Sequence, residues 1–307
     1  MLIHLDTDIG GDIDDACALA MLLGLDDVEL VGLTTNLDAG GLRAGMAAHY
    51  LSLAGREAIP VVAGAGCSLS TLERHEPCTG PRTWDVLPPA RPARPGAALD
   101  LIAANAERGA TLVAIGALTN LALLEVATPG ALARCRVVVM GGYLDPPAAG
   151  LPAFRPEHDW NVQNDTRAAE IVFAAAGELV LAPLPVCEAA HLRERDLPRL
   201  AASSPVGALI ARQAAVWAQE QEQAARGRAH AALPDDLVNF QWDPLTAALA
   251  AGFTHVQLEE VQLGFEMAGA TLLMDRVEGG RPATALRSFD AAAFEEYFLD
   301  AAGRATT

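Results

Sequence analysis

Residues 6–15 of this chain read DTDIGGDIDD, which places five carboxylates within ten positions. The apolar run LIHL precedes them at residues 2–5, and an apolar pattern with helical period follows over residues 14–23. A strand that opens through a short turn into a helix is the first unit of a parallel α/β sheet. In such sheets the ligand lies at the carboxyl ends of the strands, where this acidic run falls. The stretch therefore predicts both a fold class and the position of a site.

The same alternation continues through the first two thirds of the chain and predicts an α/β fold. We expect an open, mainly parallel, Rossmann-like sheet with helices on both faces, followed by a C-terminal hairpin over 256–275 and a closing helix over 289–302. No internal repeat or linker is visible, so residues 1–307 are expected to form a single domain. Further strands are predicted at 28–33, 60–63, 111–115, 136–140 and 179–182, and further helices at 41–54 and 165–175.

Two segments interrupt this pattern. Residues 67–96 are rich in proline and arginine and lack either periodicity, which is typical of a long loop that acts as a lid. Residues 213–236 are polar and contain the run QEQEQ, so we expect a solvated helix or a second mobile segment there.

The composition excludes several classes of partner and chemistry. Acidic residues outnumber basic ones by 39 to 21, a formal charge of −18, which disfavours nucleic-acid polymers and membrane surfaces as partners. All 21 basic residues are arginine, so a Schiff-base lysine or a P-loop lysine is excluded. The five cysteines are scattered and read as reduced thiols, and no signal peptide is visible, so a cytoplasmic protein is expected.

The acidic run itself predicts a bound cation. Several ionised carboxylates in one crevice repel each other, so either their pKa values rise or a cation binds. Because only oxygen ligands are on offer, a hard cation such as Ca²⁺ or Mg²⁺ is expected. The alternative is that these residues merely cap a helix and solvate a loop, which five carboxylates after a buried strand fit poorly.

Further motifs extend the pattern along the chain. In chain order the motifs are DTD at 6–8, DDA at 14–16, TN at 35–36, AIGALTN at 114–120, VVMGG at 138–142, EHDWNV at 157–162 and WDPL at 242–245. This ordered set, from residue 6 to residue 245, resembles the motifs of the inosine–uridine-preferring nucleoside hydrolase family.

The resemblance implies a calcium-dependent hydrolase that cleaves the N-glycosidic bond of ribonucleosides and releases ribose and free base. In this family one Ca²⁺ binds the ribose 2′ and 3′ hydroxyls and the attacking water, and the enzymes are homodimers or homotetramers. Asp8 would be the general base. The implied metal ligands are Asp8, Asp15, the main-chain carbonyl of Ile115, and Asp243. The implied contacts to the substrate come from Asp14, Asn36, Met140, Asp159 and Asn161.

Two departures from the family pattern leave questions open. The first acidic motif is two residues longer than its short form, so Asp12 is a competing metal ligand. Many members place a histidine that protonates the leaving base where this chain has Trp242, whose ring would instead stack on a base. Candidates for closing over the base or assisting its departure are His75 and Trp84 in the loop, and His230 in the polar segment.

Two other classes of function remain open. The motif LDTD also resembles that of haloacid-dehalogenase-type phosphatases, in which Asp6 would be the nucleophile, Asp8 the acid/base and Mg²⁺ the metal. That class usually needs a cationic residue, often lysine, against the phosphoryl group, and lysine is absent. A calcium-dependent nucleoside- or sugar-binding protein without turnover is the non-enzymatic alternative.

Overall fold

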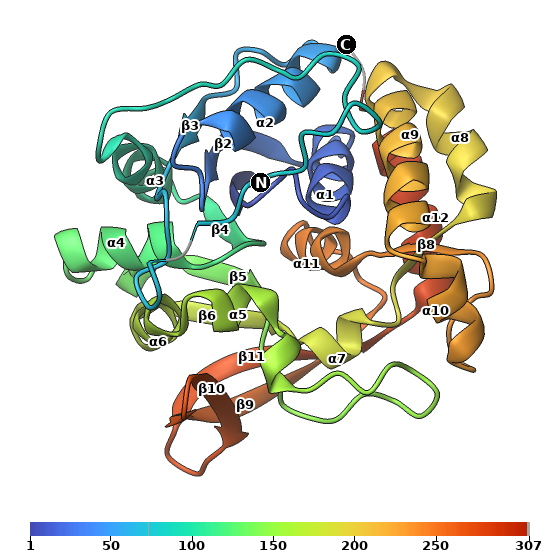
Figure 1. Ribbon diagram of the computed structural model, residues 1–307. Helices are drawn as coiled ribbons and strands as arrows, with labels where there is room; N and C mark the ends of the chain where they lie inside the picture. The colour runs from blue at the N-terminus through green and yellow to red at the C-terminus, as the bar shows by residue number, and fades with distance from the viewer. Residues whose placement is uncertain (73, 306–307) are drawn as a thin grey trace.

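A computed structural model of the chain, which describes residues 1–72 and 74–305, is built around a nine-stranded sheet (Figure 1). The strand order is β10-β9-β11-β6-β5-β4-β1-β2-β3, and the pairs from β3 to β11 are parallel. The expected mainly parallel α/β sheet is thereby confirmed. Its strands are β1 (Leu2–Thr7), β2 (Glu29–Thr35), β3 (Val61–Ala63), β4 (Thr111–Ala114), β5 (Arg136–Met140), β6 (Glu178–Ala182), β9 (Val256–Ala268), β10 (Thr271–Arg276) and β11 (Arg281–Phe289).

Helices cover both faces of this sheet because its strands are apolar on both sides. In β5, Val138 belongs to one hydrophobic core, whereas Val137 and Val139 belong to the other. The first core is shared with α1 (Asp14–Leu23), α2 (Leu42–Leu53), α9 (Pro205–Glu220), α11 (Trp242–Ala250) and α12 (Ala291–Gly303). The second is shared with α3 (Ala97–Glu107), α4 (Thr119–Ala127) and α6 (Thr166–Ala175), which lie together at one side of Figure 1.

Short elements complete the chain. They are the helices α5 (Trp160–Asn164), α7 (Leu184–Cys187), α8 (Leu197–Ser203) and α10 (Gln223–Ala229), and an antiparallel pair of strands, β7 (His191–Arg193) and β8 (Leu237–Phe240). Within the described residues, no helix combines the length and apolarity needed to cross a bilayer.

The C-terminal hairpin is part of the main sheet. Strands β9 and β10 are antiparallel as expected, and β11 pairs with β9 on one side and with β6 on the other. The hairpin therefore continues the sheet at its edge and projects at the end of the molecule in Figure 1.

The two irregular segments differ from each other. Residues 67–72 and 74–96 contain no helix or strand, and their role as a lid stays a prediction. Much of 213–236 is helical, because it holds the end of α9 and all of α10. Gln213 and Gln223 are buried there, so this segment packs against the body on one side rather than being solvated all round.

Candidate active site

The first acidic residue, Asp6, organises the carboxyl ends of neighbouring strands. Its carboxylate accepts hydrogen bonds from the Thr34 hydroxyl at 2.5 Å, the Asn36 amide at 3.0 Å and the Asn120 amide at 2.7 Å. Burial raises the pKa of Asp6 to about 6, although these hydrogen bonds lower it. Asp6 thus ties β1 to Thr34 at the end of β2 and to the segments that follow β2 and β4. It does not line the cavity that Asp14, Asp15 and Asp243 border.

Three other carboxylates form a compact buried group. Asp14 and Asp15 open α1, and Asp243 lies in the first turn of α11. Each residue is 4% exposed, and one carboxylate oxygen from each lies within 4.8 Å of those of the other two. Burial, followed by the charges of neighbouring carboxylates, raises the pKa of all three well above its ordinary value. Crowded, buried oxygen ligands at two helix N-termini have the chemistry of a divalent cation site.

This group lies in the wall of a cavity of about 420 Å³. The volume is within the range of small-molecule sites. The cavity brings together predicted residues from seven separate parts of the chain. They are Asp8, Asp14, Asp15, His75, Ile115, Met140, Asn161, Trp242 and Asp243.

Asn36 and Asp159, which were expected to hold the sugar, do not line this cavity. Asn36 is fully buried and donates its amide to Asp6. The Asp159 carboxylate caps α5 by accepting from the Val162 N–H at 3.1 Å, and it accepts from the Gly142 N–H at 2.6 Å. The Asp159 carboxylate is therefore engaged by two backbone N–H groups and the Asn36 amide N–H by Asp6, whereas the buried Asn36 Oδ1 accepts no hydrogen bond from the described residues.

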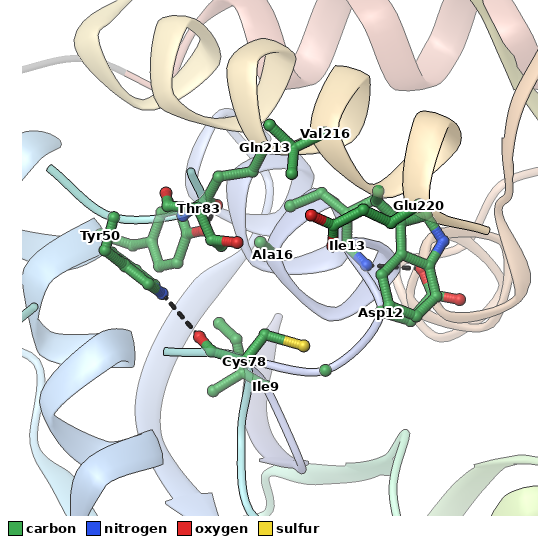
Figure 2. A pocket seen from close by; sticks show the side chains of 14 residues that line it. Ile9, Asp12, Ile13, Ala16, Tyr50, Cys78, Thr83, Gln213, Val216 and Glu220 are labelled. Atoms are coloured by element: carbon green, nitrogen blue, oxygen red, sulfur yellow. Dashed lines mark hydrogen bonds between the residues drawn. The ribbon is translucent and has the colours of Figure 1, made fainter. Parts of the chain in front are cut away.

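Trp84 and His230 also lie away from the cavity. Trp84 is 4% exposed and donates its indole N–H to the Cys78 carbonyl at 3.0 Å. It faces a separate pocket of about 30 Å³, between the loop at Asp12 and helix α9, which has room for little more than a water molecule (Figure 2). His230 ends α10 with its Nδ1 at 3.0 Å from the Arg226 carbonyl.

Trp160 contributes to the site although no role was expected for it. It is 49% exposed, and its indole N–H donates to Asp8 Oδ2 at 3.0 Å. The centroid of its ring lies 4.6 Å from that of the His75 ring, in an edge-to-face arrangement. Its position between Asp159 and Asn161 in the matched motif was the available signal in the sequence.

Arg43 is the second unexpected residue. It is 3% exposed and lines the cavity from α2. Its guanidinium donates to the carbonyls of Asp8, Ile9 at 3.0 Å and His75 at 2.8 Å. Arg43 therefore fastens the acidic loop to the irregular segment that carries His75.

Asp12 points toward a partner outside the three-carboxylate group. Its Oδ1 accepts from the Asn239 amide at 2.5 Å, and Asn239 in turn accepts from the Trp217 indole N–H at 3.0 Å. These hydrogen bonds join Asp12 to Asn239 on β8 and, through it, to Trp217 on α9.

An aromatic wall faces the rest of the cavity. Trp242 stacks on Phe240 with ring centroids 4.8 Å apart, and Phe154 lies 6.5 Å from Trp242 and 5.5 Å from His158. Phe154, His158 and Trp242 all line the cavity. Flat aromatic rings at this wall suit a planar heterocycle. Asn161, on α5, donates to the Met140 carbonyl at 3.1 Å.

Comparison with known proteins finds a matching family and several similar proteins. The family model described as inosine-uridine preferring nucleoside hydrolase matches residues 3–296. The pyrimidine-specific ribonucleoside hydrolase RihA of Shewanella sp. (strain ANA-3) is 33% identical over 224 residues, which cover 68% of this chain and 67% of that protein. The non-specific ribonucleoside hydrolase RihC of Salmonella newport (strain SL254) is 32% identical over 223 residues, covering 68% and 69%.

Solved structures share the fold. The purine-preferring ribonucleoside hydrolase of Gardnerella vaginalis superposes with a TM-score of 0.77 at 20% identity over 99% of both chains. A plant nucleoside hydrolase gives a TM-score of 0.75 at 21% identity over 97% of this chain and 98% of that one.

These matches decide between the enzyme classes considered from the sequence. The family model spans the acidic loop, the three-carboxylate group and the aromatic wall, whereas the phosphatase alternative needs Asp6 as an accessible nucleophile. Asp6 is 1% exposed and held by three donors. The chain therefore belongs to the inosine–uridine preferring nucleoside hydrolase family and is a hydrolase of N-glycosyl bonds.

Proposed function

We propose that this enzyme hydrolyses the N-glycosidic bond of ribonucleosides in a calcium-dependent reaction that yields ribose and free base. The observation that carries the proposal is the buried group of Asp14, Asp15 and Asp243 in the wall of a cavity of nucleoside-binding dimensions. The names of the relatives RihA and RihC support a ribonucleoside as substrate.

The residues present fit a calcium ion. Three carboxylates within 4.8 Å of one another are hard oxygen ligands. Burial, followed by the charges of neighbouring carboxylates, raises their pKa values, and a bound divalent cation would offset both effects. We assign the ion to Asp15 and Asp243, together with Asp8 and the Ile115 carbonyl from the same cavity. Asp14 then remains for a ribose hydroxyl. Bound calcium would supply positive charge that holds vicinal hydroxyls and makes a nearby water more acidic.

Asp8 is the general base in this proposal. It lines the cavity and is partly exposed, so a water molecule can reach it. Its Oδ2 accepts a hydrogen bond from the Trp160 indole N–H, and its main-chain carbonyl accepts one from Arg43. The first contact orients the carboxylate, and the second holds the backbone that carries it. Asp8 takes a proton from the attacking water as the water oxygen bonds to C1′.

The surrounding carboxylates favour the charge that develops on the sugar. Breaking the bond between C1′ and the base nitrogen makes the ribose ring positively charged, and fixed negative groups stabilise that charge. Asn161 and Met140 line the cavity on the side of α5 and β5 and are assigned to the sugar. The rings of Phe154 and Trp242 are assigned to the base.

A comparison of ribonucleosides with their 2′-deoxy analogues tests this assignment. Because two hydroxyls are held by the cation and Asp14, we expect kcat/KM for the deoxy analogue to fall by at least about 100-fold. Similar rates for both substrates would contradict the proposed mode of sugar binding. Stabilisation by nucleoside without release of free sugar would instead support the binding-protein alternative.

We also propose a homodimer or homotetramer, on the family resemblance. Light scattering of the purified protein tests it, and a monomer at micromolar concentration would contradict it.

A further inference from the structure

The structure leaves the departing base without the histidine that many family members place at residue 242. Among the described residues, His75 and His158 are the two histidines that line the cavity. A group that assists departure of the base must lie across the sugar from the general base, because water attacks one face of C1′ as the base leaves from the other.

The two histidines lie in different surroundings. His75 meets Trp160, whose N–H is bonded to Asp8, so His75 belongs to the side of the general base. His158 lies 5.5 Å from Phe154, and Phe154 lies 6.5 Å from Trp242, so His158 belongs to the aromatic wall that suits the base.

A hydrogen bond to His158 also indicates which of its ring nitrogens carries the proton. The Arg155 backbone N–H donates to His158 Nδ1 at 2.9 Å, so Nδ1 is the acceptor of the ring. A neutral imidazole that accepts at Nδ1 carries its proton at Nε2. The ring therefore offers an N–H at Nε2, and its geometry is set by the short helix at Pro156–His158.

We propose that His158 assists departure of the base by donating a hydrogen bond from Nε2–H to the leaving heterocycle. This inference rests on the proposed function. As the C1′–N bond breaks, its electron pair goes to the base, and the N–H of His158 stabilises the negative charge that builds there. A neutral imidazole is an effective electrophile in this role. The water oxygen bonds to C1′, its proton goes to Asp8, and solvent returns one proton to the free base.

The test compares substrates whose leaving groups differ in their need for help. The variant His158→Phe keeps an aromatic ring beside Phe154 and removes the N–H. We expect kcat/KM for inosine and uridine to fall by about 10- to 100-fold. For p-nitrophenyl riboside, whose leaving group departs without protonation, we expect a change of less than about threefold. The variant His158→Gln, which keeps an N–H donor, should recover part of the loss.

A matched control is His255→Phe. His255 is also exposed and lies 5.6 Å from a phenylalanine, Phe253, but it is not a cavity residue. Its kinetics should equal those of the wild type for both substrate types. Thermal melting of each variant confirms that it is folded.

Two results would overturn the inference: equal losses on nucleosides and on p-nitrophenyl riboside, or no loss on either. If His158→Phe fails to fold, the same comparison is made with His158→Gln and His158→Leu, and leucine must show the larger selective loss. A wild-type protein that cleaves no ribonucleoside contradicts the proposed function itself, which separates that failure from this one.

Discussion

Replacing Asp243 by asparagine should have opposite effects on the stability of the calcium-free and calcium-bound protein. The Asp243 carboxylate lies within 4.8 Å of those of Asp14 and Asp15. Two ionised carboxylates at that distance repel by about 3.5 kcal/mol at an effective dielectric constant near 20. In the calcium-free protein, protonation of the carboxylates relieves most of this repulsion, because burial and neighbouring charges raise the pKa of Asp243. We expect a residual gain of about 1 kcal/mol, or about 1.5 °C in Tm for a chain of 307 residues.

Calcium reverses the sign of this effect. At 100 times its Kd, calcium stabilises a protein by about 2.7 kcal/mol, which corresponds to about 4 °C here. The gross attraction between a divalent ion and a carboxylate oxygen at a ligand distance of about 2.4 Å is about 14 kcal/mol at the same dielectric constant, and desolvation offsets most of it. A net loss of about 3 kcal/mol weakens binding by about 100-fold. The Tm shift caused by calcium should then fall below about 1 °C.

The assay is thermal melting of wild type and Asp243→Asn in excess chelator and in calcium. Asp26→Asn, a change of an exposed aspartate on the surface, is the control and should leave both values unchanged. The reasoning is refuted if Asp243→Asn keeps the full increase in Tm caused by calcium. It is also refuted if the variant in excess chelator melts well below the wild type in excess chelator.

Trp160, Asp12 and Glu188 each give a further prediction. Trp160→Phe removes the N–H that holds Asp8, so steady-state kinetics should show kcat reduced about 10-fold with KM within about twofold; an unchanged kcat would exclude this role. Asp12→Asn should leave calcium affinity, measured by calorimetry, within about threefold, because Asp12 bonds to Asn239; a loss of about 100-fold would make Asp12 a ligand. Burial raises the pKa of Glu188 to about 8, so the folded protein keeps a proton that the unfolded chain releases, and stability is lost as pH rises from about 4.5 to about 8. Glu188→Gln should flatten the fall in Tm across that range, and an unaltered slope would contradict the assignment.

Local periodicity predicted much of the fold. The helix expected at 14–23 and the strand expected at 136–140 have these bounds in the structure, because both are short apolar runs ended by turn residues. Helix α3 was not predicted, although its buried residues Ala98, Ile102 and Asn105 follow a helical period. It begins at Ala97, directly after the loop predicted to end at residue 96, in a stretch to which no helix or strand was assigned.

Side-chain direction was harder to predict than residue type. Asn36 and Asp159 have the chemistry of sugar ligands, but a carboxylate on β1 and a backbone N–H at Gly142 engage them. Asp12 and Asn239 are 227 residues apart, so nothing local in the sequence indicates their contact. The matched motifs predicted where the site lies, whereas these long-range hydrogen bonds decide which of their side chains reach the cavity.

The most direct test of the central claim is release of ribose from a panel of purine and pyrimidine ribonucleosides, in calcium and then in excess chelator. The account predicts release of free sugar and base in calcium, loss of at least about 90% of the rate on chelation, and recovery when calcium is restored. Release that is undiminished in chelator, or absence of release from protein that binds calcium, would contradict it.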